Sequence, residues 1–218
     1  MITSADIGGV ADAARHLAPP AQTYHEEDYV MNLLATVVDF QTHTTAVVKA
    51  LESFKAQRWD EVRTIEDLEA LFRRYTEDKQ GNTALAQYLW GYNMWTRAQH
   101  LRDLVRYFRS IGVTDQERLR AWATRSTFKR DFEGRVKGLG PAVYQWLIMR
   151  LGVDTVKPDV HVRRFAETVL GRRLNDQDLI DVVVGAARVL GIPAYELDWR
   201  IWEASRAGAL QPLGVPKP

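Results

Sequence analysis

Apolar side chains recur along this chain with the period of an α-helix. Between residues 30 and 38 they occupy positions i, i+3, i+4, i+7 and i+8, and a second apolar face follows a polar stretch at residues 39–44. This spacing lines one face of a helix with side chains that must be buried against other elements. No segment alternates apolar and polar residues convincingly, as a half-buried strand does. The sequence therefore predicts an all-α fold with about ten helices.

Several residues mark where these helices begin and end. A hydroxyl residue followed three positions later by an acid predicts a helix start at Thr64 and at Thr114, and Asn175 is a further expected cap. Gly171 and Gly191 predict helix ends, because glycine readily takes the left-handed conformation that follows a last turn.

Composition narrows the class of protein. With 218 residues, of which 46% are hydrophobic, the chain can form one globular unit or two packed lobes. It has no cysteine, which excludes disulfides, a thiol nucleophile and a cysteine-held iron–sulfur cluster. We expect no signal peptide and no membrane span, and hence a cytoplasmic protein. Residues 1–22 are expected to form a short first helix or to be partly disordered, and residues 211–218 to be loose.

The net charge of +1 does not by itself indicate a nucleic-acid partner, but basic residues gather in two clusters. Residues 120–137 hold six basic side chains against two acidic ones, and residues 157–173 hold five against two. A local basic face can bind a phosphate backbone even in a nearly neutral protein. The alternative interpretation of each cluster is a solvated helix surface.

Next to both clusters lies a glycine hairpin, Val136-Lys137-Gly138-Leu139-Gly140-Pro141. Its glycines permit the positive φ of a tight turn and let a phosphate approach the backbone, while Leu139 can pack inward. Pro141 suits the first turn of a following helix, where the amides of Ala142 and Val143 are expected to be free to bind an anion. Such contacts hold DNA without reading its sequence. The alternative is a plain turn between two helices.

A single carboxylate follows the hairpin about twenty residues later. Asp159 stands between Pro158 and an apolar helical segment that includes Val162 and Phe165. It can cap that helix, which is a common role for aspartate, or it can do chemistry on a bound strand. His161 has no cysteine or acidic partners at ligand spacing and therefore does not predict a metal site.

Together the hairpin and the aspartate resemble the helix-hairpin-helix (HhH-GPD) superfamily of DNA glycosylases, which includes endonuclease III and the 3-methyladenine glycosylases. Residues 136–140 match the family's hydrophobic-x-Gly-hydrophobic-Gly hairpin, and residues 158–162 match its segment around the catalytic aspartate. The likeness covers roughly residues 28–206. Three weaker matches support it, namely Asp39-Phe40-Gln41-Thr42, Gly91-Tyr92-Asn93 and Leu197-Asp198-Trp199-Arg200-Ile201-Trp202.

The resemblance implies two helical lobes with a DNA-binding cleft between them. Residues 28–154 would form the lobe with the hairpin, and residues 1–27 together with 155–218 the lobe with the aspartate. Members of the family that also cut the strand have a lysine where this chain has Ala142, which implies a monofunctional enzyme here. The four-cysteine cluster of many members is excluded by composition. The resemblance leaves a monovalent cation at the backbone of Val136 and Gly138 as the one possible cofactor.

The resemblance also implies roles for individual residues. Asp159 would be the catalytic group, and Gln41 would fill the gap that a flipped-out base leaves in the duplex. The remaining DNA-binding positions would be Lys137, Gly138, Leu139, Gly140, Ala142 and Arg163. An aromatic pocket for the base is expected among Trp90, Tyr92, Tyr144 and Trp146.

The expected function is therefore excision of a damaged or modified base, with alkylated bases favoured, from double-stranded DNA. The protein is expected to be a cytoplasmic monomer, associated with the nucleoid if it is bacterial. Two alternatives stay open: a helix-hairpin-helix protein that binds DNA without chemistry, and a helical interaction or scaffold domain. The sequence also leaves open which base is excised, which base opposite is tolerated, and whether the role is repair or attack on foreign modified DNA.

Overall fold

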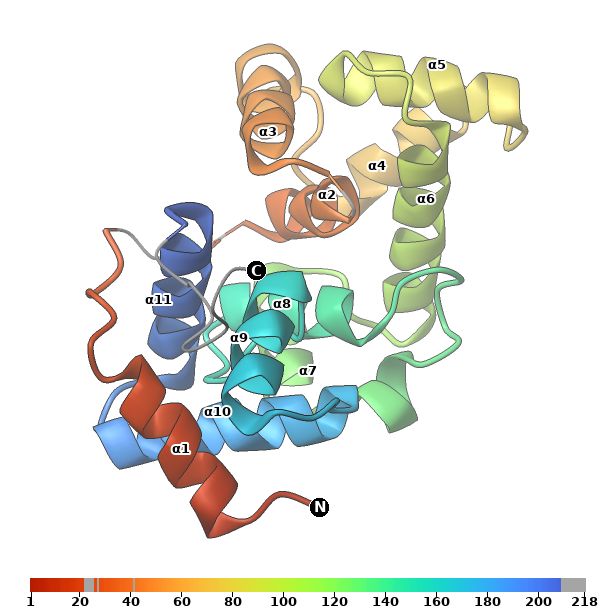
Figure 1. Ribbon diagram of the computed structural model, residues 1–218. Helices are drawn as coiled ribbons and strands as arrows, with labels where there is room; N and C mark the ends of the chain where they lie inside the picture. Colours follow the sequence, from red (N-terminus) through yellow and green to blue (C-terminus); the bar gives the residue numbers. More distant parts are fainter. Residues whose placement is uncertain (22–25, 27, 41, 209–218) are drawn as a thin grey trace. The chain divides into compact units, whose positions relative to one another are not determined.

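The computed structural model describes residues 1–21, 26, 28–40 and 42–208, and in these ranges the protein is all-helical, with no strand (Figure 1). The predicted all-α class is confirmed. No helix in the described ranges is long and apolar enough to cross a membrane. The elements in chain order are α1 (Ser4–Ala14), α2 (Tyr29–Asp39), α3 (Thr44–Arg58), α4 (Ile65–Phe72), α5 (Lys79–Trp90), α6 (Trp95–Ser110), α7 (Gln116–Arg125), the π-helical turn η1 (Phe128–Phe132), α8 (Pro141–Arg150), α9 (Val160–Leu170), α10 (Asp176–Leu190) and α11 (Ala194–Arg206).

The chain divides into two compact units. The central unit, Glu26–Leu151, contains α2 to α8, and the terminal unit, Met1–His25 with Gly152–Pro218, contains α1 and α9 to α11. These divisions lie two or three residues from the lobe borders expected at 28 and 154. The expected DNA-binding cleft concerns the placement of one unit relative to the other and stays a prediction.

The helix boundaries follow local chemistry, with one correction. Thr64 caps α4 in a reciprocal hydrogen-bonded pair with Asp67, and Asn175 caps α10, as predicted. The start predicted at Thr114 is wrong by one residue. The cap of α7 is Asp115, whose carboxylate accepts from the amide of Arg118 and is therefore the nearer and stronger acceptor. Both predicted glycine stops, after α9 and α10, adopt the left-handed conformation.

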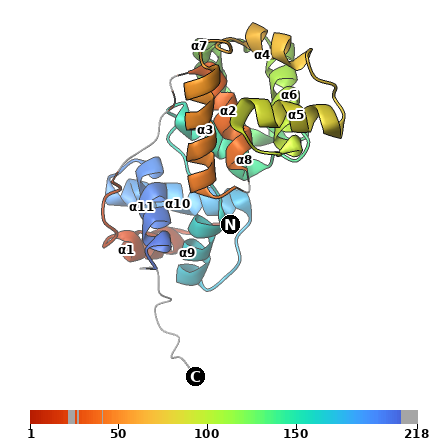
Figure 2. The same ribbon diagram turned by 90° about the horizontal axis from the view of Figure 1, so that it is seen from above.

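In the central unit α2 is surrounded by protein. All its residues from Tyr29 to Val38 are buried, and it packs against α3, α6 and α8 (Figure 2). A helix that is apolar on every side needs partners for its few polar groups. Arg150 of α8 supplies one of these contacts, donating from Nη2 to the Asn32 carbonyl at 3.0 Å and to the Thr36 hydroxyl.

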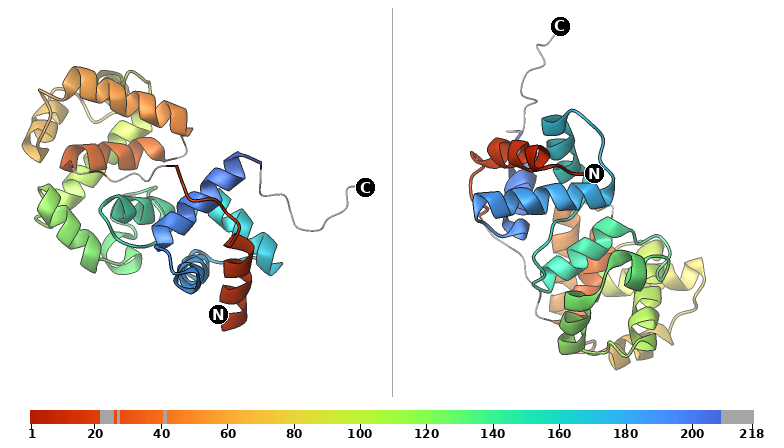
Figure 3. Two further views of the ribbon diagram at one scale, coloured as in Figure 1. Left: turned by 90° about the vertical axis from the view of Figure 1, so that its left-hand side faces the viewer. Right: turned by 90° about the horizontal axis from the view of Figure 1, so that it is seen from below.

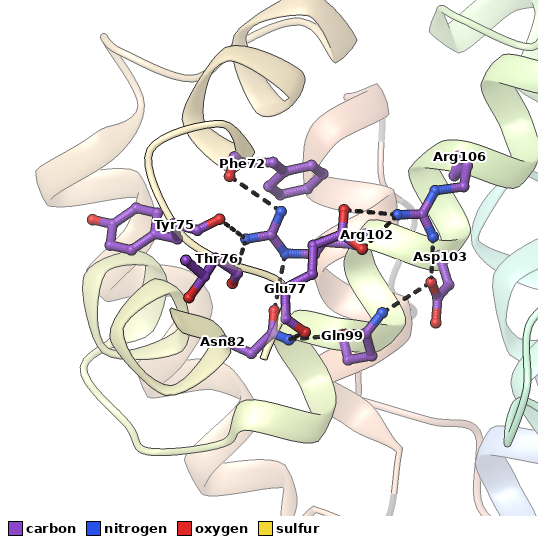
Figure 4. A network of polar contacts seen from close by, with 9 residues as sticks. All are labelled: Phe72, Tyr75, Thr76, Glu77, Asn82, Gln99, Arg102, Asp103 and Arg106. Atoms are coloured by element: carbon purple, nitrogen blue, oxygen red, sulfur yellow. Dashed lines mark hydrogen bonds and ion pairs between the residues drawn. The ribbon is translucent and has the colours of Figure 1, made fainter. Parts of the chain in front are cut away.

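A second buried arginine fixes the connection between α4 and α5 (Figure 4). The guanidinium of Arg102, on α6, is 4% exposed and donates to Asn82 Oδ1 at 2.9 Å and to the carbonyls of Phe72 and Tyr75 at 3.1 and 2.9 Å. The loop passes so close to α5 that a Cβ on Gly81 would lie 2.2 Å from the Thr76 carbonyl oxygen. Arg102 therefore satisfies backbone acceptors that the loop cannot pair by itself.

The terminal unit is built on α10. α1 packs across α10 (Figures 1 and 3), and α9 and α11 also pack against α10. Ile7 of α1 sits against Gly185, where a Cβ would lie 2.7 Å from the Ile7 side chain, so that a small residue allows the two helices to approach closely. Buried apolar side chains from all four helices form one core, among them Val10, Val162, Val183 and Ile201.

We predict that Arg102→Ala destabilises the central unit by about 2–4 kcal/mol, because it leaves several buried acceptors without a donor. Arg106→Ala is the matched control. Arg106 lies one turn further along α6 and pairs with Glu77 and Asp103 at the surface, so its loss is expected to cost less than about 1 kcal/mol. Urea unfolding of the two variants checks this, and equal stabilities would refute the role given to Arg102.

Candidate functional site

The glycine hairpin of the central unit has buried apolar anchors and an exposed turn. Val136 and Leu139 are 1% and 4% exposed, and the amide of Leu139 donates to the carbonyl of Val136 at 3.2 Å. Lys137 and Gly138 between them face solvent. Gly138 has φ 88°, a conformation that favours glycine. The expected positive φ at Gly140 is wrong: its φ is −96° because it is the extended cap of α8.

The inner side of the hairpin rests on α6. A Cβ on Gly138 would lie 3.0 Å from Nε2 of His100, so a side chain at this position would press on the imidazole. Burial lowers the pKa of His100, and the neighbouring charge of Arg97 lowers it further. This half-buried imidazole is a packing surface for the turn.

The same part of α6 contacts Phe40, the residue before Gln41. The ring of Phe40 meets that of His100 edge-on at 5.7 Å, and the guanidinium of Arg97 lies 4.9 Å from the Phe40 ring centre and donates to the Phe40 carbonyl. Gln41 itself lies outside the described residues. The hairpin and the segment that leads into Gln41 are thus held by neighbouring side chains of one helix.

The amide end of α8 follows the hairpin. Gly140 provides no side-chain cap, and the amides of Val143 and Tyr144 both donate to the Gly140 carbonyl at 3.1 Å. The expectation that the Val143 amide is free is therefore wrong. The amide of Ala142 has no partner among the described residues. One free amide at a helix N-terminus beside an exposed lysine suits an anion.

The four aromatic residues expected to form a base pocket all lie in the central unit, at two separate places. Trp90 ends α5 at 2% exposure, and Tyr92 follows it, half-buried. Tyr144 is 1% exposed and lies in an aromatic cluster of the core, where its hydroxyl is 2.9 Å from Ser126 Oγ. Trp146 is half-buried with the guanidinium of Arg150 5.2 Å from its ring centre. Tyr144 and Trp90 thus fill the core of the central unit, and the pocket stays a prediction.

Asp159, in the terminal unit, caps α9 and keeps part of its carboxylate available. Oδ1 accepts from the amides of His161 and Val162 at 2.8 and 3.1 Å. Oδ2 has no hydrogen-bond partner among the described residues, and the residue is half-buried. The two interpretations of Asp159, a cap and a reacting group, are therefore compatible: each uses a different oxygen.

The approach to Asp159 is a tight turn around the buried Pro158. The amide of Asp159 donates to the carbonyl of Lys157 at 2.7 Å, across the proline. The amide of Lys157 in turn donates to Oδ2 of Asp198 on α11 at 2.7 Å. Burial raises the pKa of Asp198 to about 8, and the nearby charge of Asp159 contributes in the same direction.

Aromatic rings of α11 gather near the start of α9. The ring of Trp202 lies 6.4 Å from that of His161 and 5.4 Å from that of Trp199, with edge-to-face geometry in both pairs. Arg206 covers Trp202, with its guanidinium carbon 4.7 Å from the ring centre. Nδ1 of His161 is 2.7 Å from Ser205 Oγ, which joins the two helices. Trp199 and Trp202 are half-buried, so the cluster is partly open to solvent.

The second basic cluster also lies in the terminal unit. Arg163 donates to the carbonyl of Leu174 at 2.6 Å and is paired with Asp176 and Glu167. It lines an open groove of about 540 Å³ on α9 together with Arg164, Arg172 and Arg173. Its predicted role in DNA binding therefore competes with a structural one.

The predicted site residues fall in two different units. Lys137, Gly138, Leu139, Gly140 and Ala142 form one turn in the central unit, while Asp159 and Arg163 belong to α9 of the terminal unit. No cluster of three or more metal-binding side chains occurs among the described residues. The monovalent cation at Val136 and Gly138 stays a prediction.

Sequence reasoning missed His100 and Asp198. Nothing near His100 in the sequence signals its contact with Gly138, which lies far along the chain. Asp198, Trp199 and Trp202 do fall in the weak family match at residues 197–202. The acid between two apolar residues there was the available signal.

A family model matches residues 10–206, and its description is a domain of unknown function, DUF8548. Because this match spans most of the chain, the protein belongs to that family. No curated protein and no solved structure is significantly similar to the chain.

We predict that Gly138→Ala costs about 1–3 kcal/mol of stability, because alanine is strained at φ 88° and its Cβ would press on His100. Gly134→Ala is the matched control, with φ 72° and nothing within 4 Å of its Cβ, and Gly140→Ala, at negative φ and equally open, should be nearly neutral. Thermal unfolding ranks the three variants. A Gly140 variant as unstable as the Gly138 variant would contradict this account.

Proposed function

We propose that this member of the DUF8548 family is a monofunctional DNA glycosylase that hydrolyses the bond between a damaged base and its sugar, with alkylated bases as the first candidates. The observation that carries the proposal is the divided carboxylate of Asp159. Oδ1 is fixed by two helix amides while Oδ2 has no partner among the described residues. A carboxylate held in this way is preorganised, so it pays little reorganisation when a positive charge develops beside it.

Cleavage of an N-glycosidic bond passes through a cation-like sugar. The Oδ2 oxygen of Asp159 would stabilise that charge and would orient or deprotonate the water that attacks the anomeric carbon. The base leaves with the bonding electron pair, and water supplies the hydroxyl group of the abasic product. The target base must first leave the helical stack, and Gln41 is the proposed residue that fills the gap.

The hairpin would hold the DNA backbone during this step. Lys137 and Gly138 face solvent and the amide of Ala142 is free among the described residues, which is an arrangement suited to one phosphate group. Ala142 stands where strand-cutting members of the resembled family have lysine. By that resemblance the product is an abasic site in an intact strand.

The aromatic cluster of α11 is a further support for a base as ligand. His161 lies in the first turn of α9, which Asp159 caps, and Trp199 and Trp202 lie on α11, which packs against α9. Arg206 covers one face of Trp202. Indole faces stack on bases and attract cationic rings, which is why alkylated purines come first. The proposed setting is a cytoplasmic monomer acting on double-stranded DNA.

We predict that Asp159→Asn lowers base release by about 10²–10³-fold while the fold and DNA binding are kept. Asparagine retains an oxygen that can cap α9, so the helix start should survive, but the negative charge is lost. The measurement is a base-release assay on duplex oligonucleotides that carry a panel of lesions, with and without alkali.

Asp178→Asn is the control for this variant, because Asp178 lies in the first turn of α10 and has only structural contacts. Alkali-dependent cleavage at one lesion, lost in Asp159→Asn and kept in Asp178→Asn, identifies the substrate. Cleavage without alkali would contradict the monofunctional assignment. A wild-type protein that binds DNA and releases no base from any lesion favours the non-catalytic helix-hairpin-helix alternative.

We predict that Lys137→Ala lowers affinity for undamaged duplex DNA and reduces the slope of log K against log salt by about 1, the contribution of one phosphate contact. Lys49→Ala, an exposed lysine on α3 of the same unit, is the control and should leave the slope unchanged. Fluorescence anisotropy at several salt concentrations measures both. An unchanged slope in Lys137→Ala would remove the hairpin from the proposed interface.

A further inference from the structure

Asp198 is a buried acid to which the proposed reaction gives no role. It lies on α11 between Leu197 and Trp199, is 7% exposed, and belongs to the terminal unit, as Asp159 does. A buried carboxyl group is costly and is retained where it has a specific partner. Its side chain accepts a hydrogen bond from the main chain of the segment that leads into Asp159.

The geometry of this bond links Asp198 to the position of Asp159. Oδ2 of Asp198 accepts from the Lys157 amide at 2.7 Å, and the Lys157 carbonyl accepts from the Asp159 amide at 2.7 Å. Pro158 lies between them and has a fixed φ, so the turn has little freedom once its first amide is held. Asp198 thus fixes one end of a rigid three-residue turn, and α9 fixes the other end through the cap.

The charge state of Asp198 follows from its surroundings. Burial is the main cause that raises its pKa to about 8, the charge of Asp159 is the second, and the Lys157 amide and ammonium group act in the opposite direction. At neutral pH the carboxyl group is therefore protonated. If it ionised, the site would hold two negative charges, one of them without solvent.

We propose that Asp198 is a positioning residue that works as an uncharged acid: it holds the Lys157–Pro158–Asp159 turn in place and leaves Asp159 as the one negative charge of the pair. A neutral acceptor fixes the turn without competing with Asp159 for the positive charge of the reacting sugar. The catalytic part of this inference rests on the proposed glycosylase function, whereas the structural part, a neutral acid that holds the turn, does not.

The sign of the pH dependence follows from the direction of the shift. The pKa of the Asp198 carboxyl group is higher in the folded state than its ordinary value of 3.8. The folded protein therefore binds this proton more tightly than the unfolded chain does. Below about pH 4 this difference does not affect the free energy of unfolding. Between about pH 4 and pH 8 it lowers the free energy of unfolding progressively, and above about pH 8 the loss is constant. The wild-type protein should lose stability over this interval relative to Asp198→Asn, whose side chain does not titrate.

The first arm of the test does not need enzymatic activity. Carbon-13 NMR of the carboxyl groups in the full-length protein, from pH 4 to 10, should show one group titrating near pH 8 that is missing in Asp198→Asn. The difference in melting temperature between Asp198→Asn and wild type should increase by more than about 5 °C, in favour of the variant, when the pH is raised from 5 to 8. Asp181→Asn, an exposed acid on α10, is the control and should gain nothing.

Hydrogen exchange at the Lys157 amide completes this arm. Asp198→Asn keeps an oxygen acceptor and should retain protection of that amide, while Asp198→Ala should lose it. A group titrating below pH 5 at Asp198, or an equally protected Lys157 amide in Asp198→Ala, would overturn the inference whether or not the protein releases bases.

The second arm measures base release on the lesion that the wild-type protein cleaves. Asp198→Asn should stay within about threefold of the wild-type rate, and Asp198→Ala should lose about 10²-fold because Asp159 is no longer held in place. The pH–rate profile of wild type should fall above pH 8, and that of Asp198→Asn should not. Wild-type rates in Asp198→Ala, or loss of activity in both variants, would refute the neutral positioning role. If wild type releases no base, the glycosylase proposal fails and the first arm alone decides the role of Asp198 in the turn.

Discussion

The first turn of α9 leaves backbone amides without partners, and one oxygen of Asp159 satisfies two of them. The rest of the terminal-unit site is arranged around this capping contact. The chain enters this cap through the turn at Pro158, and Asp198 accepts a hydrogen bond from the first amide of that turn. His161, in the first turn of α9, contacts the ring of Trp202 on α11. The capping role of Asp159 and its proposed chemical role therefore do not conflict, because they use different oxygens.

In the central unit the corresponding constraint is steric. The hairpin can approach α6 because Gly138 has no Cβ that would meet His100, and the apolar anchors on either side of the exposed turn are buried. Arg97 and His100, one turn apart on α6, also contact the ring of Phe40. A displacement of this part of α6 would therefore move both the hairpin and the chain entering Gln41, which couples two segments that the sequence separates widely.

Helix positions and helix caps were predictable where the type of a single residue decides them. The apolar period predicted helices where α2 and α3 lie, and Thr64 and Asn175 cap the helices that they were expected to cap. The faces themselves differ from the pattern, since α2 is buried on every side and Val48 of α3 is 47% exposed. The errors are equally local. At Thr114 the adjacent Asp115 is the better acceptor, and at Gly140 the glycine is extended because it begins α8 and does not form the turn. These outcomes depend on competition between neighbouring residues, which a pattern of residue types does not rank.

The sequence by itself determined the helical class, several helix boundaries, the hairpin and the position of Asp159 at a helix start, because each depends on backbone preferences within about one turn. Only the tertiary structure decided which polar groups lose their water. Asp198 is an ordinary acid by sequence, and its pKa is raised because folding buries it on α11 against the segment that contains Lys157. His100 likewise becomes the support of a glycine turn only through folding. Desolvation and close contact are set by distant parts of the chain, so they are absent from any local pattern.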